Sequence, residues 1–276
     1  MGRIGAWVVL VVVCLSGVVW GQEPSVEVGE RDELLGWYIL TERSPKQSIE
    51  EGVEERVVKE GDTLIVVDRH EGRYFATGSR GVEVPFRVCD AGLAWDLEPS
   101  SMAGTTIGLD EATGLVTIRI KDALDQRQES GEALPEVRVL VPVDRPAWMP
   151  ELTAAGPETA GDLAGMYEAA YFPLFRWYVT EGESGFAVML RWRLRDGTWR
   201  DADEGAGLFE VMEDRDGVSG LANGKGLSLR YRRDLERYEV AVQKRSGLLL
   251  MPLLRVDADA EAGMRSKVRV GIPSWH

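Results

Sequence analysis

Cysteine and histidine are scarce in this chain of 276 residues, which contains two of each. Cys14 lies in an apolar N-terminal run, so the rest of the chain has only Cys89 and cannot form an intramolecular disulfide. The histidines are His70 and the terminal His276. A zinc site needs three or four ligands, mostly histidine or cysteine, and a catalytic triad needs a base held beside its nucleophile. This composition therefore favours neither.

Signatures of catalysis and cofactor binding are also missing. The segments GESGF and GVSGL approach the G-x-S-x-G motif of serine hydrolases but lack its last glycine in register. The segment ANGKGLS does not keep the spacing of a phosphate-binding loop. The sequence therefore predicts no catalytic residue and no organic cofactor.

Cys89 and His70 are the remaining candidates for thiol chemistry. Cys89 ends VPFRVCD, where alternating apolar residues indicate a strand, so a buried structural thiol is favoured over a nucleophile. His70 lies in DRHEGR, a charged segment typical of a hairpin tip, so we expect a solvated imidazole. A Cys89–His70 dyad is the less favoured alternative.

Positive charge is in deficit, because 32 Lys and Arg face 46 Asp and Glu, giving a net charge of −14. Residues 1–21 combine a short basic start, an apolar run from Ile4 to Trp20 and the small Gly21, as in a secretory signal peptide cleaved before Gln22. An uncleaved membrane anchor is the alternative. Cleavage removes one Arg and no acid, leaving 31 against 46, or −15. We expect a secreted or periplasmic protein with no nucleic-acid partner and no stable transmembrane segment.

Two segments of similar length share an opening and a closing motif. The opening L-x-G-x-Y occurs at Leu34–Tyr38 and Leu163–Tyr167, and the closing V-R-V-x-[VI]-P occurs at Val137–Pro142 and Val268–Pro273. Interior positions also agree at an offset of 122, where Gly104, Ile107, Leu109, Val116, Ile118 and Ile120 fall on Gly226, Leu229, Tyr231, Tyr238, Val240 and Val242. We infer a tandem duplication with copies at 33–143 and 162–276.

The boundaries follow from this repeat. Residues 22–32 are expected to form a flexible N-terminal segment, and 144–161, rich in Pro, Ala and Gly, a linker. The opening motifs carry no catalytic residue, so their Leu and Tyr side chains should face the two cores. Their glycines, Gly36 and Gly165, should mark a bulge or a close backbone approach.

Each copy is rich in strand signals. The segments TLIVV, VTIRIK, FAVMLRWRL and YEVAVQ are β-branched or alternating runs, and glycine-containing turns such as Asn223-Gly224 separate such runs. The predicted fold class is all-β, with two tandem antiparallel β-sandwich or barrel domains. The segments SIEEGVEERVVKE and AEAGMRSK are the candidates for short helices.

The start of the first copy is similar to that of lipocalin-like barrels. Gly36-Trp37 places an aromatic residue after a glycine near the first strand, and up-and-down strands would follow. The second copy has Met166 where a Trp would be expected. The similarity covers one tripeptide per copy, and no residue role is taken from it.

Calcium is the one metal that the sequence leaves open. The segments DADEG (201–205), EDRDG (213–217) and DADAEAG (257–263) place carboxylates two residues apart, as in calcium loops. None continues to the bidentate Glu that an EF-hand loop requires. Solvated acidic loops are the favoured interpretation, and no metal ligand is assigned.

Arginines recur on alternate positions of two predicted strands in the second copy. In LRWRLRDGTW, Arg191, Arg193 and Arg195 should face away from Trp192, and in LSLRYRRD, Arg230 and Arg232 should face away from Leu229 and Tyr231. Together with Trp199, they could form an exposed face on adjacent strands that binds carboxylate or sulfate groups, because a guanidinium matches both bidentately. The alternative is pairing with nearby acids or with the other copy.

The sequence therefore favours an exported, non-catalytic binding protein of the cell envelope or extracellular space. Its partner would be an anionic small molecule, a glycan or an envelope protein, bound through Arg191, Arg193, Arg195, Arg230, Arg232 and Trp199. Two alternatives stay open: a glycosidase-like hydrolase with paired carboxylates, and a structural spacer in an envelope assembly.

Overall fold

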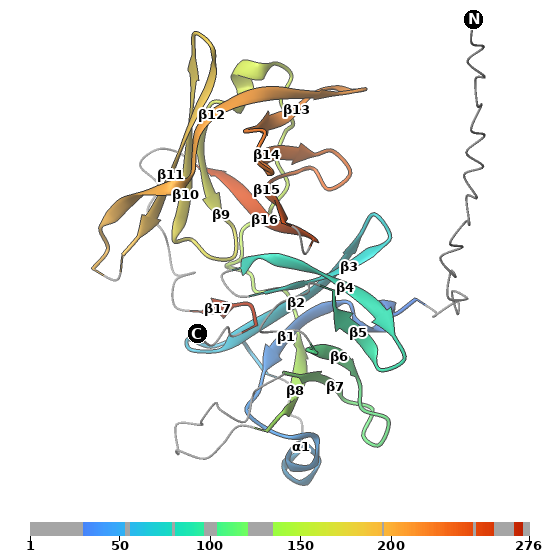
Figure 1. The fold of residues 1–276 in the computed structure, drawn as a ribbon. Helices are drawn as coiled ribbons and strands as arrows, with labels where there is room; N and C mark the ends of the chain where they lie inside the picture. Colours follow the sequence, from blue (N-terminus) through green and yellow to red (C-terminus); the bar gives the residue numbers. More distant parts are fainter. Residues whose placement is uncertain are drawn as a thin grey trace, which may run out of the picture.

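The computed structural model describes residues 30–52, 56–78, 81–96, 104–120, 135–194, 196–244, 247–256 and 268–272 (Figure 1). The protein is nearly all β, with 55% strand and 8% helix, which confirms the all-β prediction. The predicted signal peptide, Arg195 and the acidic segment 257–263 lie outside the described residues. Within those residues, no helix has the length and apolar character needed to span a bilayer.

The first eight strands close an antiparallel barrel, here called the N-terminal barrel. Each strand pairs with the next along the chain, and β8 returns to pair with β1, where Val141 lies opposite Ile39. Of the two architectures that the sequence allowed, sandwich and barrel, this part of the chain therefore forms an up-and-down barrel. The strands are β1 (Gly36–Leu40), β2 (Thr63–His70), β3 (Arg73–Thr77), β4 (Glu83–Cys89), β5 (Gly92–Trp95), β6 (Thr106–Leu109), β7 (Val116–Arg119) and β8 (Val137–Val143).

The next eight strands pair in the same cyclic order and form the C-terminal barrel. Strand β9 pairs with both β10 and β16, which closes the circuit. Strand β12 is the longest and extends beyond the barrel at both ends (Figure 1). The strands are β9 (Gly165–Ala169), β10 (Phe175–Gly182), β11 (Gly185–Arg193), β12 (Trp199–Asp214), β13 (Gly217–Ala222), β14 (Leu227–Arg232), β15 (Arg237–Lys244) and β16 (Gly247–Val256).

Glycine-containing turns close the hairpins as the sequence predicted. The β2–β3 turn has φ of 51° at Glu71 and 70° at Gly72, the two positive values of a type I′ hairpin turn. A positive φ is uncommon for a residue other than glycine, so this turn places Glu71 at a constrained position. In the β13–β14 turn, the Asn223 side chain accepts from the backbone N–H groups of Lys225 and Leu227.

Side chains fill both barrel interiors. One core cluster, including Ile65, Leu93 and Ile118, occupies the N-terminal barrel, and a second, including Phe209 and Tyr238, occupies the C-terminal barrel. These residues are all at most 1% exposed. The barrel interiors are therefore packed cores and not hollow ligand cavities.

The opening motifs have the same local structure in both barrels. Leu34, Tyr38, Leu163 and Tyr167 are buried in the cores, as predicted. In each barrel the tyrosine hydroxyl donates to the leucine carbonyl oxygen at 2.9 Å. Both glycines have φ of 145°, although a Cβ at either position would make only ordinary contacts. Backbone conformation, and not a close approach, therefore explains glycine here.

The predicted equivalence of the closing motifs is wrong. Val137–Pro142 lies in β8 and pairs antiparallel with β1 and β7. Within the described part of Val268–Pro273, β17 (Arg269–Val270) instead pairs parallel with β2, and Ile272 enters the N-terminal core. The strand that closes the C-terminal barrel is β16. The two closing motifs have similar sequences because each contains a short strand in which buried apolar residues alternate with other residues.

Within the described residues, three helical segments accompany the strands. Helix α1 (Pro45–Glu51) begins at a Ser44–Gln47 capping box. It starts just before the predicted helical segment SIEEGVEERVVKE and covers the beginning of that segment. The 3-10 helices η1 (Asp32–Leu34) and η4 (Ala160–Leu163) each precede the first strand of a barrel. The other predicted helix, AEAGMRSK, lies outside the described residues.

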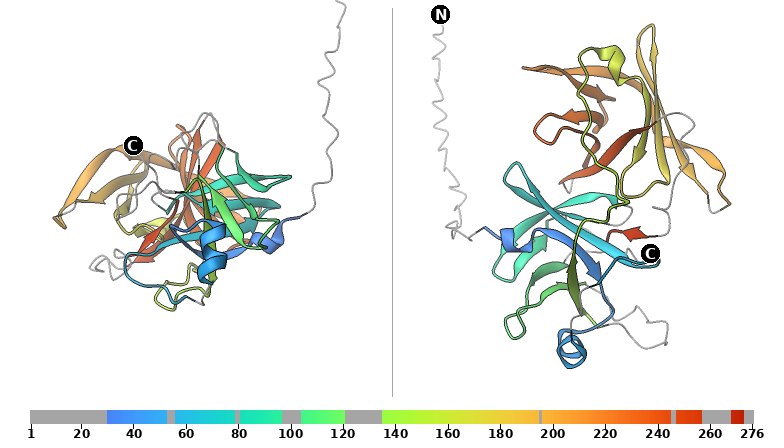
Figure 2. Two further views of the ribbon diagram at one scale, coloured as in Figure 1. Left: turned by 90° about the horizontal axis from the view of Figure 1, so that it is seen from below. Right: turned by 180° about the vertical axis from the view of Figure 1, so that it is seen from behind.

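The barrels pack against one another, with the linker beside them (Figure 2). Phe75 of β3 contacts Ala241 and Leu250 in a small apolar cluster between the barrels. The linker is held by hydrogen bonds to the C-terminal barrel, where Tyr231 donates to the Ala154 carbonyl oxygen at 2.8 Å. Another cluster joins linker residue Met149 to the outside of the N-terminal barrel.

Candidate functional site

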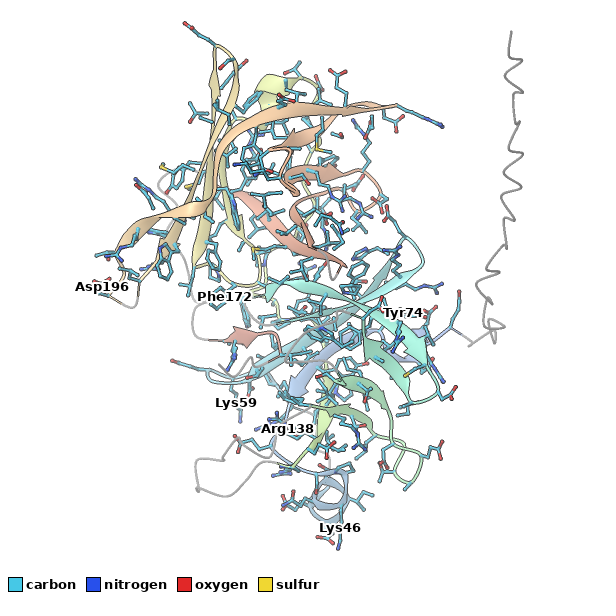
Figure 3. The ribbon with its side chains drawn as sticks, viewed as in Figure 1. Lys46, Lys59, Tyr74, Arg138, Phe172 and Asp196 are labelled. Carbon is cyan, nitrogen blue, oxygen red and sulfur yellow. The ribbon has the colours of Figure 1, made fainter. Side chains whose placement is uncertain are left out.

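Three of the predicted site residues are neighbours on the outside of the C-terminal barrel. Arg191 of β11 lies opposite Asp201 of β12, and Arg193 lies opposite Trp199. They point outward because Val188 and Leu190, at alternate positions of the same strand, pack in the core. The hairpin that carries them ends near Asp196, at the tip labelled in Figure 3.

A fourth arginine, Arg176 of β10, joins this group and was not predicted. It lies directly opposite Arg191, an arrangement of like charges that needs compensation. The guanidinium of Arg176 lies 4.5 Å from the centre of the Trp199 ring, and its Nε is 2.9 Å from Glu168 Oε2. We call Arg176, Arg191, Arg193, Tyr178, Trp199, Glu168 and Asp201 the arginine face.

Arg191 is an accessible cation of the arginine face. Its Nε donates to Asp201 Oδ1 at 2.6 Å, and its guanidinium lies 5.4 Å from the centre of the Tyr178 ring. The Arg191 side chain is 38% exposed, whereas that of Arg176 is buried. Hydrogen bonding to Asp201 raises the pKa of Arg191, so this side chain stays charged. A guanidinium has five N–H donors, so donors remain for a ligand.

The prediction that five arginines share one face of adjacent strands is wrong. Arg230 and Arg232 lie on β14, which is separated from β11 by β12 and β13. Leu229 and Tyr231 do face the core, so the predicted alternation of β14 is confirmed. The error lies in the strand order, which alternation within a strand does not specify. Arg195 is outside the described residues.

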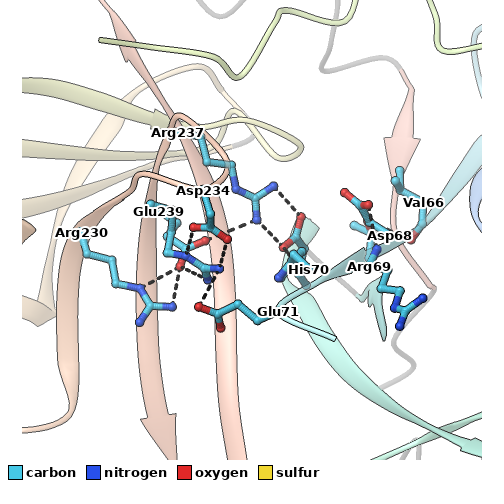
Figure 4. Close-up of polar contacts among 12 residues, drawn as sticks. Val66, Asp68, Arg69, His70, Glu71, Arg230, Asp234, Arg237 and Glu239 are labelled. Carbon is cyan, nitrogen blue, oxygen red and sulfur yellow. Dashed lines mark hydrogen bonds and ion pairs between the residues drawn. The ribbon is translucent and has the colours of Figure 1, made fainter. Parts of the chain in front are cut away.

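Arg230 instead lies within a network of ion pairs (Figure 4), and Arg232 joins the same network through Glu71 and Asp234. Arg230 Nε donates to Glu239 Oε1 at 2.7 Å. Arg232 makes two hydrogen bonds to Asp234 and an ion pair of 3.1 Å with Glu71 of the β2–β3 turn. These arginines therefore pair with nearby acids and with the other barrel, which was the alternative interpretation of the sequence.

Glu83 and Arg237 join the two barrels at the centre of this network. Arg237 of β15 donates to both oxygens of Glu83 of β4, at 3.2 and 2.7 Å. Arg237 also contacts Glu239 Oε2 at 3.3 Å. The three residues are 4%, 3% and 0% exposed for Arg237, Glu83 and Glu239, so the ion pair lies out of water. We call Glu83, Arg237, Glu239, His70, Arg230, Arg232, Asp234 and Glu71 the junction network.

The expectation of a solvated His70 is wrong. The residue is 5% exposed, and its ring stacks on Phe75 with centroids 4.0 Å apart and places Nε2 at 3.3 Å from Glu83 Oε2. His70 is buried at the end of β2, beside the C-terminal barrel, although the turn residues Glu71 and Gly72 that follow it are exposed. Cys89 is partly exposed at the other end of β4, six residues or about 20 Å of strand from Glu83. The two residues thus do not form a dyad.

The junction network sets the ionisation of Glu83. Burial acts to raise the pKa of this carboxyl, but the hydrogen bond from His70 and the charge and hydrogen bonds of Arg237 outweigh it. The net effect lowers the pKa of Glu83. Arg237 stays charged for the same reason, since the two neighbouring carboxylates raise its pKa in spite of burial.

This lowered pKa predicts an acid dependence of stability. Ionised Glu83 contributes stability above its unfolded pKa of about 4.3, and that contribution is lost as pH falls through the lower folded pKa. In urea unfolding, the free energy of unfolding should therefore fall more steeply below about pH 4.5 in the wild type than in Glu83→Gln. Glu136→Gln, in an exposed pair with Arg119, is the control that should keep the wild-type slope. Equal slopes for Glu83→Gln and the wild type would contradict this assignment.

Several site residues were missed by the sequence interpretation. Arg237 and Glu239 alternate with Tyr238 and Val240 in RYEVAV, the same signal that identified the arginines of β14. Glu83 occupies an outward position of β4, beside inward Val84. Alternation could have placed all three outside the barrels, but their mutual contact depends on how the barrels pack.

The acidic segments do not form a recognisable metal site in the described structure. Residues 201–205 lie inside strand β12 and not in a loop, which corrects one calcium candidate. Residues 213–217 end β12 and turn into β13, whereas 257–263 lie outside the described residues. Among the described residues, no group of three or more His, Cys, Asp or Glu is arranged to hold a metal ion.

The arginine face and the junction network therefore differ in kind. The arginine face presents an exposed guanidinium beside aromatic rings. In the junction network, the charged side chains pair with one another between the barrels. No family model, no curated protein and no solved structure matches this chain.

Proposed function

We propose that this protein is an exported, non-catalytic binding protein whose arginine face binds an anionic ligand, in particular a sulfated or carboxylated glycan. The observation that carries the proposal is the direct opposition of Arg176 and Arg191 on adjacent strands. Arg176 pairs with Glu168 and Arg191 with Asp201, and Arg193 and Trp199 continue the row. An anion would relieve the repulsion between the opposed cations.

The chemistry of the arginine face fits such a ligand. Guanidinium groups bind carboxylate and sulfate through paired N–H donors, and they do so better than ammonium groups. Tyr178 and Trp199 hold two of the guanidinium planes and offer ring surface beside them. A glycan has both the anionic groups and the flat C–H faces that this combination would contact.

The packed interiors of the barrels also favour binding at the outer surface. Both barrels are filled with apolar side chains, which leaves the outer faces as the place for a ligand. The buried carboxylates Glu83 and Glu239 accept from arginines and are shielded from water, which does not support acid–base catalysis by this pair. A binding role is therefore preferred over a hydrolase.

The proposal includes a duplicated architecture and export. The two barrels have the same cyclic strand order and the same opening structure, with tyrosine bonded to leucine. Their sixth and seventh strands also share a register, with Ile107 opposite Ile118 and Leu229 opposite Val240. These agreements support descent from one ancestral barrel. Export rests on the N-terminal pattern of residues 1–21 and places the protein in the envelope or outside the cell.

Charge reversal tests the anion site. The Arg191→Glu/Arg193→Glu variant should elute from immobilised heparin at lower salt than the wild type, because two contacts to the polyanion become repulsive. The matched control is Arg43→Glu/Arg119→Glu, which makes the same change in net charge at two exposed arginines of the N-terminal part. Equal loss of retention in both variants would show a general charge effect and contradict a specific site.

A structural spacer is the second candidate. The junction network and the apolar contact of Phe75 with the C-terminal barrel hold the two barrels in one arrangement. A spacer needs this rigidity and no ligand. It would predict identical heparin elution for the wild type and the Arg191→Glu/Arg193→Glu variant after correction by the charge-matched control.

A further inference from the structure

A groove lies where the N-terminal barrel, the linker and the C-terminal barrel meet, away from the arginine face. Its volume is about 450 Å³, within the range of small-molecule sites. Such sites occur preferentially at junctions of this kind. The lining of the groove includes Trp37, Asp68, Arg145, Met149, Tyr171 and Arg237.

One wall of the groove is aromatic and apolar. Trp37 of β1 is half-buried and meets Tyr171 edge to face, with ring centroids 6.2 Å apart. Met149 and Leu152 of the linker extend the same surface. Burial raises the pKa of Tyr171, so its hydroxyl stays protonated as a potential donor.

The lining also contains a buried ion pair. Arg237 is 4% exposed, and its terminal nitrogens are engaged by Glu83 and Glu239. Its Nε has no hydrogen-bond partner within the described structure, but it is shielded from solvent and therefore out of reach of a ligand in the open groove.

The charges around the groove favour a neutral ligand. The positive charge of Arg237 is already balanced by Glu83 and Glu239, and Asp68 adds a further exposed carboxylate. An anion would be repelled here. Arg145, at the other side of the rim, donates to the Pro150 carbonyl oxygen at 2.7 Å and would oppose a cation.

We propose that this groove binds a neutral sugar unit. Its hydroxyls can accept from Arg145 while donating to Asp68, and one C–H face of its ring can lie on Trp37. A purely apolar ligand would leave the polar groups unpaired, and a charged one would meet the wrong balance of charge. This inference is independent of the proposed anion site, because the two share no residue.

Calorimetric titration with maltose, cellobiose, lactose and N,N′-diacetylchitobiose tests the inference. At least one of the four should bind the wild type, with an affinity unchanged between low and high salt because the ligand is neutral. Asp68→Asn should weaken that binding about tenfold or more, since it replaces a charged acceptor on the rim. Asp90→Asn, an exposed residue away from the groove, is the control and should bind as the wild type does.

The following results would contradict sugar binding in the groove. Binding of none of the four sugars would overturn the inference, as would equal affinity of Asp68→Asn and Asp90→Asn. A loss of sugar binding in Arg191→Glu/Arg193→Glu, with Asp68→Asn unaffected, would assign the sugar to the arginine face instead. Retained heparin binding in Asp68→Asn keeps this test separate from that of the proposed function.

Discussion

Replacing Glu83 with alanine should lower the free energy of unfolding by about 3–5 kcal/mol. The change leaves Arg237 buried, charged and without its bidentate partner between the barrels. Only the 3.3 Å contact with Glu239 then remains, and a buried charge that loses its main partner costs far more than the ion pair itself contributes. Glu136→Ala, which breaks the exposed pair with Arg119, should cost less than about 1 kcal/mol. Urea unfolding of the three proteins measures the difference.

A double substitution separates the two parts of this effect. Glu83→Leu/Arg237→Met removes both charges and should recover much of the stability lost in Glu83→Ala, because no buried charge is left alone. A double variant as unstable as Glu83→Ala would mean that packing, and not charge, explains the loss. A Glu83→Ala variant as stable as Glu136→Ala would contradict the burial of the junction network.

Phe209→Ala should lower the free energy of unfolding by about 3–5 kcal/mol. Phe209 of β12 is 1% exposed in the core of the C-terminal barrel, so its removal leaves a cavity that the closed sheet cannot collapse. Its neighbour Leu208 points outward and is 68% exposed. Leu208→Ala should therefore stay within about 0.5 kcal/mol of the wild type. Similar effects of the two substitutions would contradict a filled barrel interior.

Strand alternation is the part of the fold that the sequence predicts well. The periodicity of β14 assigned Leu229 and Tyr231 to the core and Arg230 to the outside, and this assignment is confirmed. The opening motifs likewise predicted buried Tyr38 and Tyr167. Such patterns are local, because side chains on a strand alternate between the two faces whatever the strand pairs with.

Pairing between distant segments is the part that the sequence does not predict. The parallel pairing of β17 with β2 joins residues about two hundred positions apart, and no local pattern specifies it. His70 has the flanking charges of a solvated tip, yet the neighbouring barrel buries it against Phe75. The partners of Arg232 include Glu71 from the other barrel, which sequence spacing does not indicate.

The candidate site was predicted only in part, because it too depends on pairing between strands. Arg191, Arg193 and Trp199 were identified because they belong to one hairpin, where spacing determines which residues lie opposite one another. Arg176 lies on the preceding strand, in FRWY, where a single arginine among aromatic residues does not by itself indicate a charged face. The register of β10 against β11 is what brings it opposite Arg191.

The most direct measurement of the central claim is nuclear magnetic resonance with a heparin disaccharide as the titrant. The Nε–H signals of Arg191 and Trp199 should shift first and in a saturable way, with the Nε–H signal of Arg230 unchanged, because only the former belong to the arginine face. Raising the salt concentration should reverse the shifts. Shifts centred on Arg230 and Arg232, or no saturable shift at Arg191 and Trp199, would contradict the proposed anion site.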